Sequence, residues 1–304
     1  MRSYILSAAA GMVLMAGALA AAFTAAAAIW PDRMPPPAIS GSIATDEKLK
    51  YLRDRGREPV DVLAIGSSIT WKHLDGAPFD GRVGNFVNGG TAYLQVHEIR
   101  TFTRFYLDLY PRISQVVMLS ALPDYGTCAG EGRIMDLEDA ASYVRGRMPE
   151  AWFYMRYFAP LRYVLQARRR SERLKPYDAF GYWLDRHGTT PSMLPTEVGY
   201  DLRYDEIALD PACLEALDGL NRDLRARGVT FTLVMTPVAP RYSDLHPATT
   251  RATERIESFA RSRGIRLIDF FGDPSFEDAD FWDAFHMQWP AARRLSREVA
   301  DTLL

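Results

Sequence analysis

The sequence predicts an α/β fold, in which a mostly parallel sheet is covered by helices on both faces. The first observation is a set of five short apolar runs typical of buried strands, at residues 60–65, 83–88, 114–120, 229–235 and 265–270. The second is that segments with helical periodicity separate them, since residues 92–109 follow the second run and residues 252–264 precede the fifth. A last helix is expected from about residue 291 onward. This alternation favours parallel strands joined by helical crossovers.

The N-terminal segment is the most apolar part of the chain. Residues 4–30 contain no charged side chain and consist mainly of Ala, Leu, Val, Met, Ile and Phe. A signal peptide has an apolar core of about 7 to 15 residues, whereas a membrane span needs about 20. The length of residues 1–30 therefore favours a retained membrane anchor, although the alanines at 25–28 also permit an A-x-A cleavage site. Either outcome exports the rest of the chain.

The charge at the N-terminus indicates an orientation. Arg2 and the amino group lie on the short leading side of the apolar segment, which favours a cytoplasmic N-terminus. We therefore expect the protein to be anchored in the inner membrane facing the periplasm, or secreted to the periplasm if the segment is cleaved. Residues 31–44 are rich in proline and small residues and are predicted to form an extended linker. The folded domain is expected at residues 45–304, beginning with a short helix that ends at Gly56.

The connection between the third and fourth strands is too long for a simple crossover. We expect a helical insertion at about residues 122–212, which builds a lid or flank of the domain. Within it, apolar side chains recur at helical spacing, at Trp152, Met155, Phe158, Leu161 and Leu165. Basic side chains follow at Arg168, Arg169, Arg170, Arg173 and Lys175. One interpretation is a helix that packs on the core with a solvated basic end. The other is that these cations meet phospholipid headgroups or an anionic glycan.

Composition excludes several classes of function. A net charge of −2 over 304 residues provides no general attraction to nucleic acid. No Cys or His cluster has the spacing of a zinc site, so we expect no metal, cofactor or nucleic-acid partner. The chain has two cysteines, Cys128 and Cys213. In an oxidising compartment they could form a disulfide, and otherwise they would be two buried thiols.

Two short motifs carry the candidate chemistry. Ligands bind outside the carboxyl ends of parallel strands, and the first strand runs into Gly66 and Ser68. A serine at such a turn can equally be a helix cap. Near the other end of the chain, Asp283 lies three residues before His286. At that spacing the carboxylate can orient the imidazole and leave its other nitrogen free to take a proton from a serine.

Taken together, these motifs resemble those of the SGNH hydrolase superfamily, also called the GDSL esterases, over roughly residues 60 to 300. Ser68 stands at the nucleophile position of the first block, Gly90 follows the second strand in N-x-G spacing from Asn88, and Asp283 and His286 match the D-x-x-H block. The resemblance implies a three-layer α/β/α flavodoxin-like SGNH fold with a mostly parallel five-stranded sheet. It also implies a catalytic triad of Ser68, Asp283 and His286, with the backbone N–H groups of Ser68 and Gly90 as oxyanion-hole donors.

The third block departs from the family pattern. Ala121, Pro123 and Asp124 occupy the places of Gly, Asn and Asp, so the oxyanion-hole asparagine is missing. Losing one such donor typically lowers turnover by about a hundred- to a thousandfold. Asn88 or Thr91 could supply a substitute donor. The residues predicted to bind substrate are Asn88, Asp124, Tyr125 and Pro237, the last in a proline-rich loop that resembles one in many relatives.

The predicted function is acyl transfer to water or to a sugar hydroxyl. The anchor, the degenerate third block and the long insertion resemble extracytoplasmic SGNH proteins that acylate cell-surface polysaccharides, often beside a membrane-bound acyltransferase. We therefore expect an O-acetyltransferase or acetylesterase whose partner is a surface polysaccharide or another acylated glycan. One alternative is a non-catalytic glycan-binding or scaffold protein, and another is a periplasmic lipase or thioesterase. Aromatic side chains near the motifs could stack on sugars or form packed walls, namely Tyr93, Tyr125, Trp282 and Trp289.

Overall fold

The computed structural model describes residues 2–30, 33–128, 135–194 and 207–303. The chain forms two compact units. The first, which we call the N-terminal unit, comprises Met1–Arg57 and Arg133–Lys175, and the second, the sheet unit, comprises Glu58–Gly132 and Pro176–Leu304. The insertion expected at about 122–212 is thus divided, because its segment from 133 to 175 belongs to the N-terminal unit.

The sheet unit contains the predicted five-stranded sheet. Its strands are β1 (Val62–Ala64), β2 (Phe86–Asn88), β3 (Gln115–Ser120), β6 (Thr230–Met235) and β7 (Arg266–Asp269). Their order is β2-β1-β3-β6-β7, and every neighbouring pair is parallel. This order is that of flavodoxin-like sheets, with a switch point between β1 and β3. The α/β fold class and all five predicted strands are confirmed. A separate two-stranded sheet pairs β4 (Tyr177–Asp178) with β5 (Ser192–Met193).

Helices cover both faces of the five-stranded sheet. The helices of this unit are α3 (Ser68–His73), α4 (Val96–Leu109), α8 (Pro211–Ala226), α9 (Pro240–Leu245), α10 (Pro247–Ser262) and α11 (Trp289–Leu303). Short 3₁₀ turns form at η1 (Ala77–Phe79), η2 (Leu122–Tyr125) and η3 (Asp278–Asp280). The crossover from β1 to β2 runs one way along the sheet, whereas the crossovers from β2 to β3, from β3 to β6 and from β6 to β7 run the other way. Because each crossover is right-handed, α3 lies on one face of the sheet and α4, α8 and α10 lie on the other. The contacts agree, since α3 packs with α11 and α4 packs with α8.

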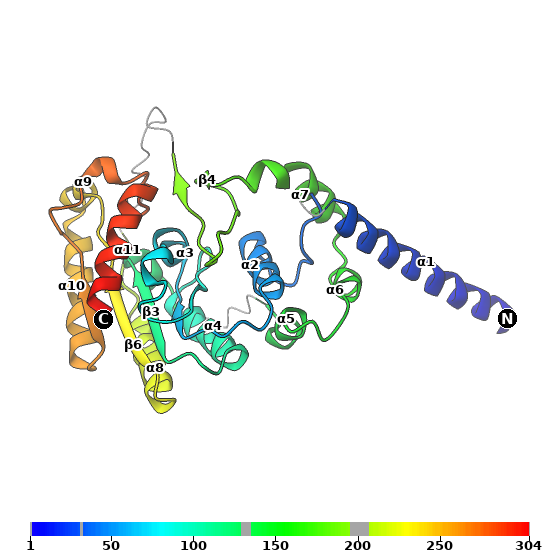
Figure 1. Cartoon of the computed structure of the whole chain (residues 1–304), viewed down its shortest axis with the longest axis horizontal. Coiled ribbons are helices and arrows are strands. Elements are labelled where there is room, and N and C mark those ends of the chain that lie inside the picture. Colours follow the sequence, from blue (N-terminus) through cyan, green and yellow to red (C-terminus); the bar gives the residue numbers. More distant parts are fainter. Residues whose placement is uncertain (1, 31–32, 129–134, 195–206, 304) are drawn as a thin grey trace. The chain divides into compact units, whose positions relative to one another are not determined.

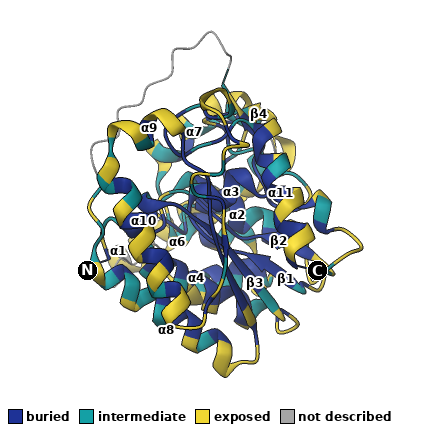
Figure 2. Cartoon of the chain, turned by 90° about the vertical axis from the view of Figure 1, so that its left-hand side faces the viewer, coloured by how far each residue is buried: buried dark blue, intermediate teal, exposed yellow. Residues whose placement is uncertain are grey.

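The burial of the strands on both faces explains why their positions could be predicted from apolar runs in the sequence. Five of the six residues in β3 and in β6 are buried, as is expected of strands covered on both faces. Figure 2 shows the strands in the buried colour, with exposed residues on the outward sides of α8 and α10. In α4 the buried residues Ile99, Phe102 and Tyr106 recur at helical spacing, and Gln95 and Glu98 form a capping box at its start.

The N-terminal unit is helical. It contains α1 (Arg2–Ile29), α2 (Ile43–Asp54), α5 (Leu137–Val144), α6 (Glu150–Arg156) and α7 (Pro160–Arg173). Within α1, the 26 residues Tyr4–Ile29 have a mean hydropathy of 2.1 and are long and apolar enough to cross a membrane. Such a helix near the N-terminus fits a signal anchor or a signal peptide.

The segment predicted as an extended linker is packed instead. Pro35, Pro36 and Pro37 are buried. The hydroxyl of Tyr154 donates to the carbonyl oxygen of Pro35 at 2.8 Å, and Ala38 N–H donates to the hydroxyl of Tyr163 at 3.1 Å. Proline-rich sequence specifies an extended backbone but not its solvation, and here residues 35–40 contribute to the interior of the N-terminal unit.

Candidate active site

Ser68 is positioned by a tight turn between β1 and α3. A Cβ atom at Gly66 would lie 2.1 Å from Oγ1 of Thr70, so only glycine fits there. Thr70 in turn donates to the carbonyl oxygen of Leu119 at the end of β3, at 2.8 Å. The cap of α3 is Ser67, whose side chain accepts from Ile69 N–H at 3.2 Å. Because the neighbouring serine caps the helix, the hydroxyl of Ser68 is available for another partner.

The structure brings Ser68, His286 and Asp283 together. Oγ of Ser68 lies 2.9 Å from Nε2 of His286, although the two residues are 218 positions apart in the sequence. Nδ1 of His286 lies 2.7 Å from Oδ2 of Asp283. Ser68 and His286 are partly exposed, whereas Asp283 is buried. A hydroxyl, an imidazole and a carboxylate thus lie in series, in the order that a nucleophile, a base and an orienting carboxylate would need, and the first two belong to partly exposed residues.

Asp283 is held in its ionised form. Burial by itself would raise the pKa of this carboxyl, but the hydrogen bond and charge of His286 and two backbone N–H groups together lower it below its ordinary value. The N–H groups are those of Phe285 and His286, which donate to Oδ1 at 2.8 and 2.7 Å. An ionised Asp283 keeps a proton on Nδ1 of His286 and leaves Nε2 as the acceptor that faces Ser68.

A short closed loop carries the carboxylate and the imidazole. An antiparallel bridge pairs Phe281 with Met287, and Trp282 N–H donates to the carbonyl oxygen of His286 at 2.8 Å. Met287 N–H donates to Nε2 of His73 at 3.0 Å, so the proton of His73 is on Nδ1. Burial holds the pKa of His73 well below its usual range. His73, to which the sequence assigned no role, thus joins the loop to the helix that begins with the serine.

An aromatic wall with a buried cation lies beside the imidazole. The ring of Trp282 stacks on that of His286 with centroids 4.7 Å apart. Nζ of Lys72 lies 5.8 Å from the ring of Trp282 and 4.9 Å from that of Trp71, and burial lowers the pKa of Lys72 to about 8. The half-exposed ring of Phe180 meets Trp282 edge to face at 5.9 Å. No sequence signal identifies Lys72 or Phe180, because their partners come from segments far along the chain.

The second block, the loop from Asn88 to Gly90, holds helix α3 in place as well as lying close to the candidate site. A Cβ atom at Gly90 would lie 2.6 Å from the backbone nitrogen of Trp71, so glycine allows this loop to approach α3. Asn88 is fully buried, its Oδ1 accepts from Gly90 N–H at 3.0 Å, and its Nδ2 donates to the carbonyl oxygen of Thr70 at 2.8 Å. Asn88 therefore ties the second block to the helix of Ser68.

The expected oxyanion donors differ in availability. Gly90 N–H already donates to Asn88, so it can meet a substrate oxygen only by sharing or breaking that bond. Ser68 N–H, at the first position of α3, has no hydrogen-bond acceptor among the described residues. Of the two suggested substitutes, Asn88 donates its side-chain amide to backbone carbonyls, and Thr91 is buried, with its backbone N–H donating to the carbonyl oxygen of Gly66 at 3.1 Å. The oxyanion-hole assignment stays a prediction, with Ser68 N–H as the donor that is not already engaged.

The other predicted substrate-binding residues lie below the surface. Asp124 accepts from the hydroxyl of Ser120 at 2.9 Å and from Ala121 N–H at 3.3 Å. Burial raises the pKa of Asp124 to about 6, although hydrogen bonds from Ser67 and Ser120 oppose the shift. Tyr125 and Pro237 are also buried. Direct contact of these residues with substrate stays a prediction.

The two cysteines form a disulfide. Cys128 and Cys213 are bonded, with their Cα atoms 5.1 Å apart. Cys128 N–H also donates to Oδ2 of Asp210, the residue that caps α8, at 2.7 Å. Of the two alternatives left open by the sequence, the structure has the paired one. The bond holds the segment after the third block against the start of α8.

The four aromatic residues near the motifs divide into two kinds. Tyr125 and Trp289 are buried and serve as packed walls. Tyr93 is 89% exposed and adopts a left-handed backbone conformation with φ of 63°. A bulky residue in this conformation is strained, and such strain is found more often at functional sites. Trp282 is only partly buried and stacks on His286.

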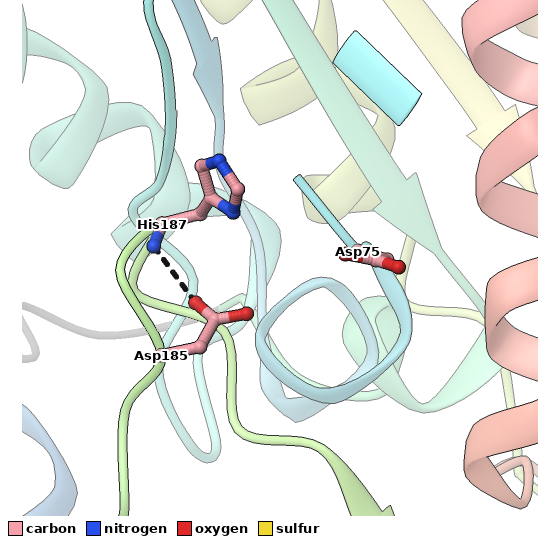
Figure 3. A group of neighbouring side chains, drawn as sticks. All are labelled: Asp75, Asp185 and His187. Carbon is pink, nitrogen blue, oxygen red and sulfur yellow. Dashed lines mark hydrogen bonds between the residues drawn. The ribbon is translucent and has the colours of Figure 1, made fainter. Parts of the chain in front are cut away.

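One group of metal-ligating residue types occurs among the described residues, at Asp75, Asp185 and His187 (Figure 3). Each of the three side chains already has a protein partner. Asp185 accepts from the backbone N–H groups of His187 and Thr189 at 2.8 and 2.9 Å, and Asp75 lies 3.3 Å from Nε of Arg293. Nε2 of His187 lies 2.9 Å from Asp80. We interpret this group as a polar cross-link of the loop after α3.

No protein-family model matches the chain. No curated protein matches its sequence. Among solved structures, it is similar to a protein from Streptococcus pneumonia reported as a candidate platelet activating factor, at 13% identity and a TM-score of 0.44, over 85% of this chain and 91% of that one. It is also similar to a candidate acylhydrolase from Bacteroides fragilis, at 11% identity and a TM-score of 0.44, over 84% and 97% of the two chains. Likeness at this level says nothing of activity.

Proposed function

We propose that this protein is an SGNH-type serine acyl-transfer enzyme that acts outside the cytoplasm. The observation that carries the proposal is the chain of two short contacts, 2.9 Å from Ser68 to His286 and 2.7 Å from His286 to Asp283. These contacts link the turn after the first strand with a loop near the C-terminus, as the D-x-x-H block of that superfamily would require. The accessible Oγ and Nε2 atoms provide the nucleophile and the base.

The proposed reaction proceeds in two acyl transfers. Nε2 of His286 takes the hydroxyl proton of Ser68 while Oγ attacks an ester carbonyl carbon, and Asp283 stabilises the imidazolium. The tetrahedral intermediate collapses when its C–O bond breaks and the leaving alcohol receives the proton from His286. The acyl-serine is then attacked by an acceptor hydroxyl that His286 deprotonates, and the released Oγ of Ser68 regains that proton. Water as acceptor gives an esterase, and a sugar hydroxyl gives an O-acyltransferase.

The proposed location is the periplasmic face of the inner membrane. An apolar helix of 26 residues supports a membrane anchor, and the Cys128–Cys213 disulfide supports an oxidising compartment. Packing also supports retention of this helix. Phe23 of α1 meets the rings of Tyr154 and Tyr163 at 5.5 and 5.6 Å. Cleavage after the alanines at 25–28 would remove Phe23 and expose these two rings.

The proposed acceptor or substrate is a cell-surface polysaccharide, which makes the enzyme an O-acetyltransferase or an acetylesterase. The exposed ring of Tyr93 and the aromatic wall of Phe180 and Trp282 support it, since sugar rings stack on aromatic faces. A membrane-bound acyltransferase as a partner follows from the resemblance to anchored relatives. A non-catalytic glycan-binding protein is the second candidate, favoured by the engagement of Gly90 N–H and by Pro123 in the place of the oxyanion-hole asparagine.

Labelling with a serine-directed fluorophosphonate, followed by mass mapping, tests the proposal. We expect an adduct on Ser68 that is absent from Ser68→Ala and from His286→Ala. The matched control is His246→Ala, which removes a partly exposed histidine that packs on Tyr242 and should leave labelling unchanged. A natively folded protein that forms no adduct and still binds glycan would favour the non-catalytic candidate.

The acceptor is tested separately with aryl acetates and acetylated polysaccharide. Transfer to a glycan hydroxyl, or deacetylation of the polymer, is the expected activity. Hydrolysis of longer acyl esters or thioesters that greatly exceeds both would instead assign a periplasmic lipase or thioesterase.

A further inference from the structure

The N-terminal unit exposes a row of large apolar side chains on α6, on α7 and in the connection between these helices. Their exposed fractions range from 45% for Phe158 to 72% for Leu161. The members of this row, which we call the α6–α7 face, are Trp152, Phe158, Leu161, Val164 and Leu165. The structure does not bear out the interpretation of this stretch as a core-packing helix. It is two helices, because the first ends at Arg156 and the second begins at Pro160.

The outward direction of this face is fixed by what the other side of α7 buries. Tyr163 and Arg170, two turns apart, are the buried residues of this helix. Arg170 donates to both carboxylate oxygens of Glu47 at 2.7 and 2.8 Å, in a pair whose side chains are each 6% exposed. Leu161 and Leu165 lie on the opposite side of a helix with 3.6 residues per turn. A rotation that buried them would break this buried ion pair, which is strongly unfavourable.

The α6–α7 face adjoins the membrane-spanning candidate helix. Phe23 of α1 contacts Phe158 at 5.9 Å between ring centroids, in addition to its contacts with Tyr154 and Tyr163. Figure 1 shows α6 and α7 beside the C-terminal end of α1. Both belong to the same compact unit as α1, so the depth of α1 in a bilayer determines the depth of the face.

Helix geometry gives that depth. The segment Tyr4–Ile29 extends about 39 Å, whereas the hydrocarbon core of a bilayer is about 30 Å thick. If the core begins at Tyr4, Phe23 lies about 28 Å further along the helix, at the opposite boundary of the core. The cluster of Phe23, Tyr154 and Tyr163 then lies at the level where aromatic side chains gather in membrane proteins.

We propose that the α6–α7 face lies in the interfacial layer of the membrane that α1 spans, as a second contact of the protein with lipid. This proposal rests on retention of α1. The apolar half of α7 is the half next to α1, and exposed cations follow it at Arg168 and Arg169. Long basic side chains extend toward headgroups while apolar side chains enter the bilayer, so this order along α7 places its apolar half below the headgroups and the two arginines among the phosphates. The occupant of the face is the bilayer.

Site-specific fluorescence in the full chain tests this contact. Both native cysteines are in the disulfide, so Leu161→Cys or Leu165→Cys introduces one thiol for an environment-sensitive dye. Glu138→Cys, at an exposed polar position on α5 of the same unit, is the matched control. Each labelled protein is reconstituted into phosphatidylcholine vesicles with and without phosphatidylglycerol, and with spin-labelled lipids as quenchers. None of these residues belongs to the candidate active site, so the result is independent of acyl-transfer activity.

We expect blue-shifted emission at positions 161 and 165 that lipid-borne quenchers extinguish, and unshifted, unquenched emission at position 138. Phosphatidylglycerol should strengthen the quenching, because Arg168 and Arg169 attract anionic headgroups. Water-like emission at both apolar positions would overturn the proposal. A blue shift without quenching by lipid would also overturn it, because the face would then be covered by a second copy of the chain. Quenching at all three positions would show unspecific collapse onto the vesicle and would equally count against it.

Discussion

Loss of the Cys128–Cys213 disulfide is expected to lower the free energy of unfolding substantially. The two residues are 85 positions apart, and in the chain-entropy model a cross-link over such a distance restricts the unfolded state by about 4.5 kcal/mol at 25 °C. Measured losses on removing native disulfides are commonly about 2 to 5 kcal/mol. We therefore expect a loss of this order, which is a large part of the typical stability of a folded domain.

Urea titration of the full chain in detergent measures this loss in three samples. These are the oxidised protein, the same protein after reduction, and the double variant Cys128→Ala/Cys213→Ala. Reduction changes no side-chain volume, whereas the double variant also removes two buried sulfur atoms, so the variant should be the least stable. Hydrogen exchange should also quicken at residues 122–128, which the bond holds against α8. An unfolding midpoint that stays constant on reduction, while both thiols become titratable, would refute this reasoning.

Three further predictions concern the candidate site. Asp283→Asn should lower turnover of an aryl acetate by about 10⁴-fold, because His286 would lose its orienting anion. The pKa of Asp283 is lower in the folded state than in the unfolded state. Its carboxylate therefore stabilises the fold fully above the unfolded pKa, and this stabilisation is lost as pH falls through the folded pKa. The free energy of unfolding should accordingly fall less steeply with acid in Asp283→Asn than in the unchanged protein, and an identical fall in both would contradict this. Tyr93→Ala should raise KM for polysaccharide but not for an aryl acetate, and equal effects on both substrates would argue against sugar stacking.

The strands and the candidate triad could be predicted because their signals are local. Strands covered on both faces are continuous apolar runs, as in β3 and β6. Gly66 and Gly90 stand where no side chain fits, and Asp283 reaches His286 within one short loop. Chain order then placed these segments at one edge of the sheet, since the ends of parallel strands lie together.

Hydrogen-bond partners from distant segments could not be predicted. The side chain of Lys72 donates to the hydroxyl of Ser192, 120 positions away, at 3.1 Å. The backbone N–H of Gly90, which the resemblance makes an oxyanion-hole donor, donates to Oδ1 of Asn88. Nothing in the residue types at these positions specifies which neighbour the fold brings within reach.

The sequence by itself determined which segments are strands, which are apolar enough to enter a membrane, and which side chains can form a Ser-His-Asp arrangement. Each of these follows from periodicity, length or chemistry within a few residues. Only the tertiary structure decided that the proline-rich segment is packed, that Cys128 and Cys213 pair, and that Leu161 and Leu165 face outward. The physical reason is that an apolar side chain is stabilised by removal from water whichever group it packs against, whereas the tertiary structure determines which groups lie close enough to pack against it.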